Sequence, residues 1–271
     1  IKDSKEIETY KGKVYCIEGD IACSHRDSDN SYKYLNKEHY VICLRADFSM
    51  PIIYDIYNNY VNEIVYISKY YCTDLKNPKN RFLGSPKYDY INFDKEEIYN
   101  KYKLDEIKKY ILIFFPKNRN RPNTYYPSKN KMLEIYKICK SLDYEILIKT
   151  RKQDRIEDKN LKDKYYFEEG NHYPNVALEL LSISNLAIIF SSSAIEECIY
   201  MKVPIIDIKI DDISRLNFLL NKIIYIKINI NNQNLFNKLK DNIKLIKKND
   251  IIFNNIINKY LISNKCSKNI I

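Results

Sequence analysis

The stretch "FSSSAIEECIYMKVPIIDI", Phe190 to Ile208, decides the fold of this chain. An apolar, strand-like run leads into three serines, a helix-like segment follows, and a second apolar run begins at Val203-Pro204. A strand, a turn, a helix and a second strand in this order make a βαβ unit with two parallel strands. The three serines therefore stand where a strand passes into a helix, in a chain with only four glycines.

The same alternation of apolar strands and amphipathic helices continues on both sides of this stretch. We expect strands within 108–117, 144–151, 164–170, 185–190, 203–210 and 223–230. We expect helices within 128–143, 174–184, 193–202, 232–250 and 251–261. This pattern is typical of a parallel sheet covered on both faces by helices. It predicts a doubly wound, Rossmann-like α/β domain, although the sequence carries no G-x-G-x-x-G motif.

The first hundred residues are less regular but similar in kind. Strands are expected within 13–21, 39–48, 63–68 and 81–89, and helices within 51–61 and 93–104. We therefore expect two domains, with residues 1–105 forming the first and residues 106–271 the second. Because the sequence does not begin with Met, the first domain is expected to be short or truncated.

Composition narrows the class of protein without naming a partner. The formal net charge of +10 indicates either an anionic partner or a chain-wide composition bias, since Tyr is abundant and Trp is absent. No recognised nucleic-acid motif is present, so nucleic acid is not an expected partner. The seven cysteines contain no C-x-x-C pair, which favours a reducing, cytoplasmic compartment over a disulfide framework or a zinc ribbon.

The serine run has two interpretations. In open parallel sheets, ligands bind beyond the carboxyl ends of the strands, where loops lead into helices. Backbone N–H groups and hydroxyls of Ser191, Ser192 and Ser193 would favour a diphosphate there, whereas a single serine would suffice as a helix N-cap. Glu196 and Glu197 follow, either as complements of the helix dipole or as acceptors for ribose hydroxyls.

With these motifs in order, the sequence resembles the donor-binding domain of GT-B glycosyltransferases. The resemblance covers about residues 80–210 and is carried by 173–208, by "FLGSPKYD" (82–89) and by the strands 110–121 and 144–151. It is closest to the CDP-glycerol glycerophosphotransferase and surface-polysaccharide transferase group, and the segment is also similar to UDP-N-acetylglucosamine 2-epimerases. Asn185 replaces the usual Asp, Lys202 the usual Gly, and Lys87 the usual Arg.

The resemblance implies two Rossmann-like domains in GT-B arrangement, with an acceptor side in 1–105 and a nucleotide-donor side in 106–271. It implies transfer of a sugar or polyol-phosphate from a CDP- or UDP-linked donor to a glycan or polyol hydroxyl, in polysaccharide biosynthesis. A nucleotide-sugar 2-epimerase and a non-catalytic nucleotide- or glycan-binding module are the alternatives. The expected location is cytoplasmic, either free or peripherally attached to the inner face of the membrane.

Further basic and aromatic residues follow the expected strands of the second domain. Lys117, Arg119, Lys149 and Arg151 stand at the same sheet edge, as a phosphate clamp or as solvated loop charges. The resemblance places the loop of His172 and Tyr173 near the nucleotide base, where Tyr173 would stack and His172 would hydrogen-bond. The alternative for both is a plain surface loop.

The catalytic base is the least defined part of the site. The resembled glycerophosphotransferases use a histidine in a His-Gly phrase that this sequence lacks. Glu18, Asp20, His25 and Asp47 are the candidates in the first domain, and "EGD" at 18–20 is otherwise a turn. The "DSD" at 27–29 is interpreted as a solvated loop, so neither a metal nor a cofactor is predicted.

Overall fold

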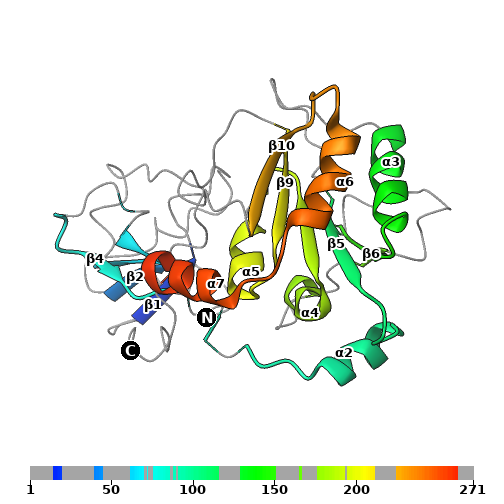
Figure 1. The fold of residues 1–271 in the computed structure, drawn as a ribbon. Coiled ribbons are helices and arrows are strands. Elements are labelled where there is room, and N and C mark those ends of the chain that lie inside the picture. The colour runs from blue at the N-terminus through cyan, green and yellow to red at the C-terminus, as the bar shows by residue number, and fades with distance from the viewer. Residues whose placement is uncertain are drawn as a thin grey trace. The chain divides into compact units, whose positions relative to one another are not determined.

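The chain forms two compact α/β units, shown as a ribbon in Figure 1. One unit comprises residues 1–90 together with 256–271, and the other comprises residues 91–255. The structure is a computed structural model, and it describes residues 15–19, 40–44, 62–69, 72, 76–85, 88–89, 91–115, 129–150, 165–166, 176–192, 194–210 and 224–261. The expected helix at 51–61 lies outside these residues.

The second unit is built on a six-stranded sheet whose paired strands are all parallel. Its strand order is β10-β9-β8-β5-β6-β7, so the first strand of the unit lies in the interior of the sheet. Each strand falls within a range expected from the sequence. The strands are β5 (Tyr110–Phe114), β6 (Glu145–Lys149), β7 (Tyr165–Tyr166), β8 (Leu186–Ile189), β9 (Ile205–Lys209) and β10 (Tyr225–Asn229).

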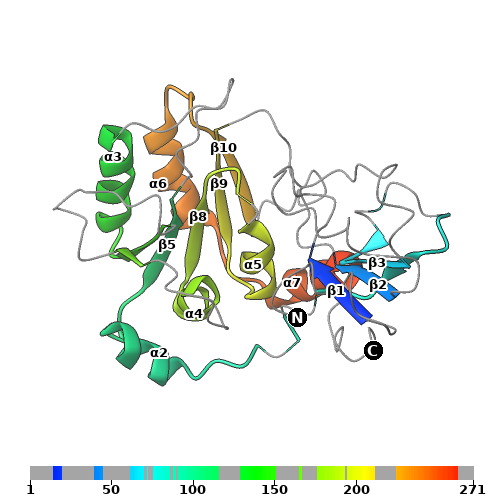
Figure 2. The same cartoon turned by 180° about the vertical axis from the view of Figure 1, so that it is seen from behind.

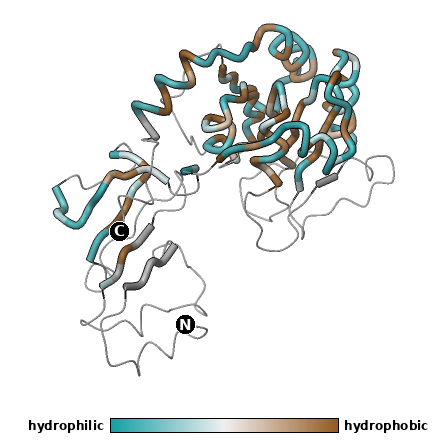
Figure 3. Tube along the Cα trace, turned by 90° about the horizontal axis from the view of Figure 1, so that it is seen from below, coloured by the Kyte–Doolittle hydropathy of each residue, from teal (hydrophilic) through white to brown (hydrophobic). Residues whose placement is uncertain are grey.

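One face of this sheet packs against helices α3 (Lys129–Lys140) and α6 (Leu235–Leu245). Every second residue of the strands enters this layer, because successive side chains of a strand point to opposite faces. In Figure 3 the hydrophobic residues recur along these strands and helices. Each fully buried aliphatic side chain contributes about 1.5–3 kcal/mol to folding. The layer includes Ile111, Ile113, Met132, Ile135, Cys139, Ile146, Ile148, Leu186, Ile188, Ile206, Ile208, Ile228, Leu235, Leu239 and Ile243.

The other face is covered by helices α4 (Val176–Ile183) and α5 (Ile195–Tyr200), which Figure 2 shows from that side. Six of the eight residues of α4 are buried, because α4 contacts β5, α5 and an earlier helix, α2 (Lys95–Tyr102). Two covered faces explain why β5 and β8 are continuous apolar runs without alternating polar residues.

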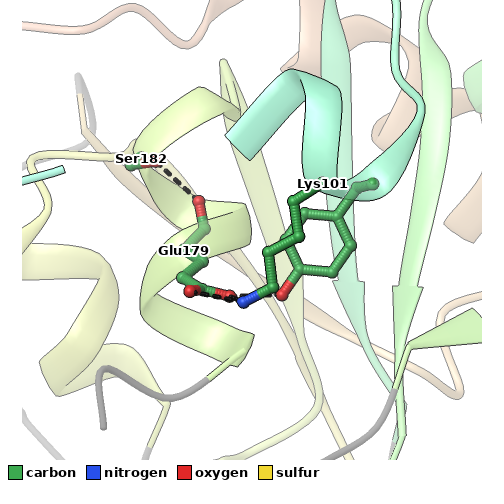
Figure 4. Close-up of polar contacts among 4 residues, drawn as sticks. Lys101, Glu179 and Ser182 are labelled. Carbon is green, nitrogen blue, oxygen red and sulfur yellow. Dashed lines mark hydrogen bonds and ion pairs between the residues drawn. The ribbon is translucent and has the colours of Figure 1, made fainter. Parts of the chain in front are cut away.

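Helix α2 (Lys95–Tyr102) precedes β5 and is fixed to α4 by a buried carboxylate, drawn in Figure 4. The Lys101 ammonium donates to both carboxylate oxygens of Glu179, at 2.8 and 2.7 Å. The Tyr102 hydroxyl donates to the same carboxylate. Asp94 caps the start of α2 by accepting hydrogen bonds from the backbone of Glu96 and Glu97.

Replacing Glu179 by Gln is expected to lower the free energy of unfolding by about 1–2 kcal/mol, because hydrogen bonds to a buried charged group are worth more than neutral ones. Urea unfolding followed by circular dichroism measures this change. Glu145→Gln is the matched control, since the Glu145 side chain is 30% exposed against 11% for Glu179, and its loss should cost less than about 1 kcal/mol. Equal losses in both variants would show that Glu179 does not hold α2 on α4.

The first unit contains a four-stranded parallel sheet in the order β1-β2-β3-β4. The strands are β1 (Tyr15–Gly19), β2 (Tyr40–Leu44), β3 (Glu63–Tyr66) and β4 (Asn80–Phe82). Tyr40 and Arg81 both donate to the Glu63 carboxylate at 2.6 Å, which ties three strands together. Burial raises the pKa of Glu63, but these hydrogen bonds and the Arg81 charge outweigh it and leave the pKa below its ordinary value.

The last helices differ from the expectation. The expected helix at 232–250 is shorter, since α6 ends at Leu245 and the next residue, Ile246, has an extended backbone and a buried side chain. The Asn249 side chain accepts a hydrogen bond from the backbone of Ile252, which starts helix α7 (Asp250–Ile256). A π-helical turn, η7 (Ile257–Leu261), continues the chain. The second compact unit begins at residue 91 and ends at residue 255, and it includes α2, which packs on α4. The domain boundary expected at 105/106 stays a prediction.

Candidate functional site

The strand order of the second unit locates a switch point between β5 and β8. From β5 the chain winds in one direction through β6 and β7, then returns to the other side of β5 with β8, β9 and β10. The crossover loops leave such a sheet in opposite directions at this point, which opens a crevice beyond the carboxyl ends of the two strands. The residues after Phe114 and after Ile189 therefore stand at the position where open parallel sheets bind ligands.

The turn after β8 has an uncommon backbone. Ser191 adopts a left-handed conformation with φ 43°, which is disfavoured for any residue with a Cβ atom. The Ser192 hydroxyl accepts a hydrogen bond from the backbone N–H of Ala194 at 3.3 Å. Ala194, directly before α5, has helical backbone angles and makes no side-chain capping bond. The bond from its N–H to Ser192 is of the kind that an N-cap serine makes, so the N-cap alternative stays beside the phosphate-site prediction. The serine side chains shape the turn itself.

A buried carboxylate that sequence reasoning missed supports this turn. Asp207 lies within β9 and accepts hydrogen bonds from the Ser191 backbone N–H and from the Tyr225 hydroxyl, both at 2.9 Å. The Ser191 hydroxyl in turn accepts a hydrogen bond from the Ile210 backbone at 3.2 Å. The available signal was a single Asp inside the apolar strand "VPIIDIKI", because a carboxylate in a strand covered on both faces needs internal hydrogen-bond donors.

Lys149 and Thr150 lie at the carboxyl end of β6, next to β5. Lys149 pairs with Phe114 in the sheet, is 8% exposed, and donates from its ammonium to the carbonyl of Thr150 at 3.0 Å. Thr150 is 3% exposed, and its hydroxyl makes no hydrogen bond within the structure as described. The predicted cationic residue of this edge is thus buried at the sheet and is not a solvated loop charge.

The two glutamates of α5 differ in burial, as expected for neighbours on a helix. Glu196 is buried, whereas Glu197 is partly exposed. Between the helix and the sheet, burial raises the pKa of the Cys198 thiol well above its ordinary value, and the charges of Glu197 and Asp207 raise it further. Cys198 therefore stays protonated at neutral pH and has no nucleophilic character.

The remaining predicted site residues are only partly covered by the structure. Glu18 is the fourth residue of β1 and pairs with Cys43 of β2, one position before the strand ends. The structure brings Ser191, Ser192, Glu196, Glu197 and Lys149 into the second unit, around the carboxyl edge of its sheet. Outside the described residues lie Asp20, His25, Asp47, Lys117, Arg119, Arg151, His172, Tyr173 and Ser193.

Two features are absent from the described residues. In that part of the chain, no group of three or more His, Cys, Asp and Glu side chains is placed to hold a metal ion. None of the helices described is both long and apolar enough to cross a membrane. The "DSD" at 27–29 lies outside the residues that the structure describes.

Comparison with known proteins bears on the fold. No protein family profile matches the sequence, and no curated protein matches it. Among solved structures, a form of the wall teichoic acid polymerase TagF soaked with CDPG is 15% identical, covers 88% of this chain and 68% of its own, and has a TM-score of 0.59. Staphylococcus aureus MnaA with UDP is 13% identical, covers 98% of this chain and 77% of its own, and has a TM-score of 0.57.

The UDP-GlcNAc 2-epimerase from Methanocaldococcus jannaschii is also similar, at 16% identity. It covers 91% of this chain and 75% of its own, with a TM-score of 0.55. Likeness at these identities concerns the fold, and it agrees with the parallel sheets of both units. The expectation from sequence is confirmed to that extent: the chain has a GT-B glycosyltransferase-like α/β fold.

Proposed function

We propose that this protein transfers a sugar or a polyol-phosphate from a nucleotide-diphosphate donor to a hydroxyl acceptor. The observation that carries the proposal is the serine turn after β8, which lies at the switch point of a GT-B-like sheet. Two of the similar structures were determined with CDPG or UDP, which supports a CDP- or UDP-linked donor. The acceptor is a glycan or polyol of polysaccharide biosynthesis, used in the cytoplasm or at the inner face of the membrane.

In this proposal the diphosphate binds at Ser191, Ser192 and Ser193, where the three hydroxyls and the backbone N–H groups of Ser192 and Ser193 donate to its oxygens. The N–H of Ser191 donates to Asp207. Arg119 and Arg151, with Lys117, neutralise the charge that develops on the departing nucleotide. Lys149, buried at the same edge, adds its positive charge close to the sheet. Glu196 or Glu197 accepts hydrogen bonds from the ribose hydroxyls, and His172 and Tyr173 contact the base.

The reaction forms one bond and breaks one. The acceptor oxygen attacks the sugar carbon or the phosphorus of the polyol-phosphate, and the bond from that atom to the donor oxygen breaks. The acceptor proton passes to a base, and the electron pair of the broken bond leaves with the nucleotide. Glu18, Asp20, His25 and Asp47 are the candidate bases, since a carboxylate or imidazole within reach of the hydroxyl can accept its proton.

A nucleotide-sugar 2-epimerase is the second candidate, favoured by the similarity to the Methanocaldococcus jannaschii enzyme. It shares the fold and a nucleotide-diphosphate site, so nucleotide binding alone does not separate it from a transferase. Product analysis does: an epimerase interconverts two nucleotide sugars without an acceptor, whereas a transferase releases a nucleotide when an acceptor is present. A binding module would bind nucleotide and turn over neither.

Calorimetric titration with CDP and UDP, followed by a donor-turnover assay, tests the proposal. We expect saturable binding of at least one of the two nucleotides, and turnover that is unchanged by EDTA. The reason is that cationic side chains and oriented N–H groups can stabilise a leaving diphosphate without a metal ion. Loss of turnover in EDTA with recovery on adding Mg²⁺ or Mn²⁺ would contradict the metal-independent mechanism. The "DSD" at 27–29 would then be the candidate metal-binding motif.

A further inference from the structure

Asp207 is an acidic residue in the interior of an otherwise apolar strand. It is 6% exposed, and its neighbours Ile206 and Ile208 belong to the core layer under α3 and α6. Because side chains alternate along a strand, Asp207 lies on the opposite face, the face of α4 and α5. Its influence on the pKa of Cys198 in α5 agrees with this placement.

The two carboxylate oxygens of Asp207 accept from different neighbouring strands. One accepts from the backbone N–H of Ser191, directly after β8, and the other accepts from the Tyr225 hydroxyl of β10. Burial raises the pKa of Tyr225, and the Asp207 charge and hydrogen bond raise it further, so the phenol keeps its proton and remains a donor. Tyr225 therefore holds the carboxylate, and the carboxylate holds the turn.

Ser191 is fixed to β9 through both its backbone and its side chain. Its N–H donates to Asp207, and its hydroxyl accepts from the backbone N–H of Ile210. These two bonds hold Ser191 at φ 43°, a conformation that costs a residue with a Cβ atom about 1–2 kcal/mol. The next residue, Ser192, then continues into the turn at the switch point of the sheet.

We propose that Asp207 is a positioning residue that holds the serine turn in its donor-binding conformation. The inference rests on the proposed function, because it assigns Asp207 a part in the same nucleotide site. A purely structural role explains the residue poorly: a buried carboxylate carries a large desolvation cost, and an apolar side chain of similar size would fill the strand without it. One of these two hydrogen bonds goes to the turn, and the other goes to the tyrosine that orients the carboxylate.

Three variants separate positioning from stability. Asp207→Asn keeps an acceptor oxygen for the Ser191 N–H and is expected to bind CDP or UDP within about threefold of the wild-type protein. Asp207→Leu has no acceptor for the Ser191 N–H, so Ser191 leaves its left-handed conformation. The affinity for CDP or UDP is then expected to fall about tenfold, because binding must restore that disfavoured conformation. The third variant is Asp207→Leu in a Ser191→Gly background, compared with Ser191→Gly alone, which has already lost the Ser191 hydroxyl. In that background Asp207→Leu is expected to lower the affinity less than about threefold, because glycine adopts φ 43° without strain.

Calorimetry with CDP and UDP gives the affinities, and thermal unfolding of the same samples gives the stability. Ile206→Val, at the adjacent buried position, is the control for a stability loss without a change in affinity. If Asp207→Leu does not fold, Asp207→Ala takes its place, since its smaller side chain leaves room for water beside Tyr225. A stability loss with unchanged nucleotide affinity in the folded variant would overturn the inference. If the wild-type protein binds neither nucleotide, the proposed function fails and this inference falls with it.

Discussion

Replacing Ser192 and Ser193 together by valine is expected to weaken the binding of CDP or UDP at least about tenfold. A diphosphate needs close approach to the backbone of the turn, and two branched side chains block that approach while removing two hydroxyl donors. The Ser192 hydroxyl also accepts from Ala194, so its loss loosens the turn before α5. Calorimetric titration measures the affinity, and thermal unfolding shows that the fold survives.

The matched control changes two serines at the other end of the sheet. Ser182 and Ser184 donate to carbonyls of α4, and the neighbouring Asn185 bonds to the first residue of β5, Tyr110. Valines at 182 and 184 make the same change in composition far from the carboxyl edge and should leave nucleotide affinity unchanged. If both double variants bind nucleotide as the wild-type protein does, the phosphate site is not at the serine turn.

Neutralising Arg119 and Arg151 together, by glutamine, is expected to lower kcat/KM for the donor by about a hundredfold or more. Removing a single group that stabilises developing charge typically costs about 10²–10³ in rate, and arginine binds phosphate oxygens in a bidentate manner. Lys240→Gln with Lys244→Gln is the control, because both lysines are exposed on α6. This control removes the same net charge and is expected to change kcat/KM less than about threefold.

Comparing the arginine and lysine double variants also tests whether the net charge of +10 has a functional role. Equal losses in the arginine and lysine variants would mean that the basic surface as a whole carries the function. Binding of single- or double-stranded nucleic acid near physiological salt, with a steep salt dependence, would lead to the same conclusion. A loss confined to the arginine pair supports a few specific contacts to one diphosphate.

Sequence reasoning was strongest where the signal is local. Runs such as "YILIF" and "NLAIIF" have no alternation, so they predict strands buried on both faces, and the structure places β5 and β8 there. The ends of helices were harder to predict. Helix α6 ends at Leu245, because the next residue, Ile246, has an extended backbone and buries its side chain in the core. No local sequence pattern indicates this. The strand order depends on pairing between residues far apart in sequence, and periodicity carries no information about it.

The position of the serine turn in the fold was predictable from the sequence, but the residue that supports the turn was not. The serines after β8 follow from the rule that ligands bind at the carboxyl edge of a parallel sheet. The carboxylate that holds Ser191 comes from the next strand, 16 residues later, and joins it only once β8 and β9 have paired. Whether a histidine or a carboxylate of the first unit is the base stays a prediction, since Asp20, His25 and Asp47 lie outside the described residues.

The pairing of β5 with β8 has a consequence for how the chain acquires its shape. Ile111 of β5 pairs with Leu186 of β8, and the Tyr110 backbone donates to the Asn185 side chain across 75 residues of sequence. Closing a loop of that length costs entropy before any contact compensates for it, so this step is slow compared with forming the β5-α3-β6 neighbours. During synthesis the ribosome must release β8 before the two strands can meet. The switch point between them is thus a late product of folding, and a nascent chain that ends before β8 has part of a sheet without the edge at which we propose that the donor binds.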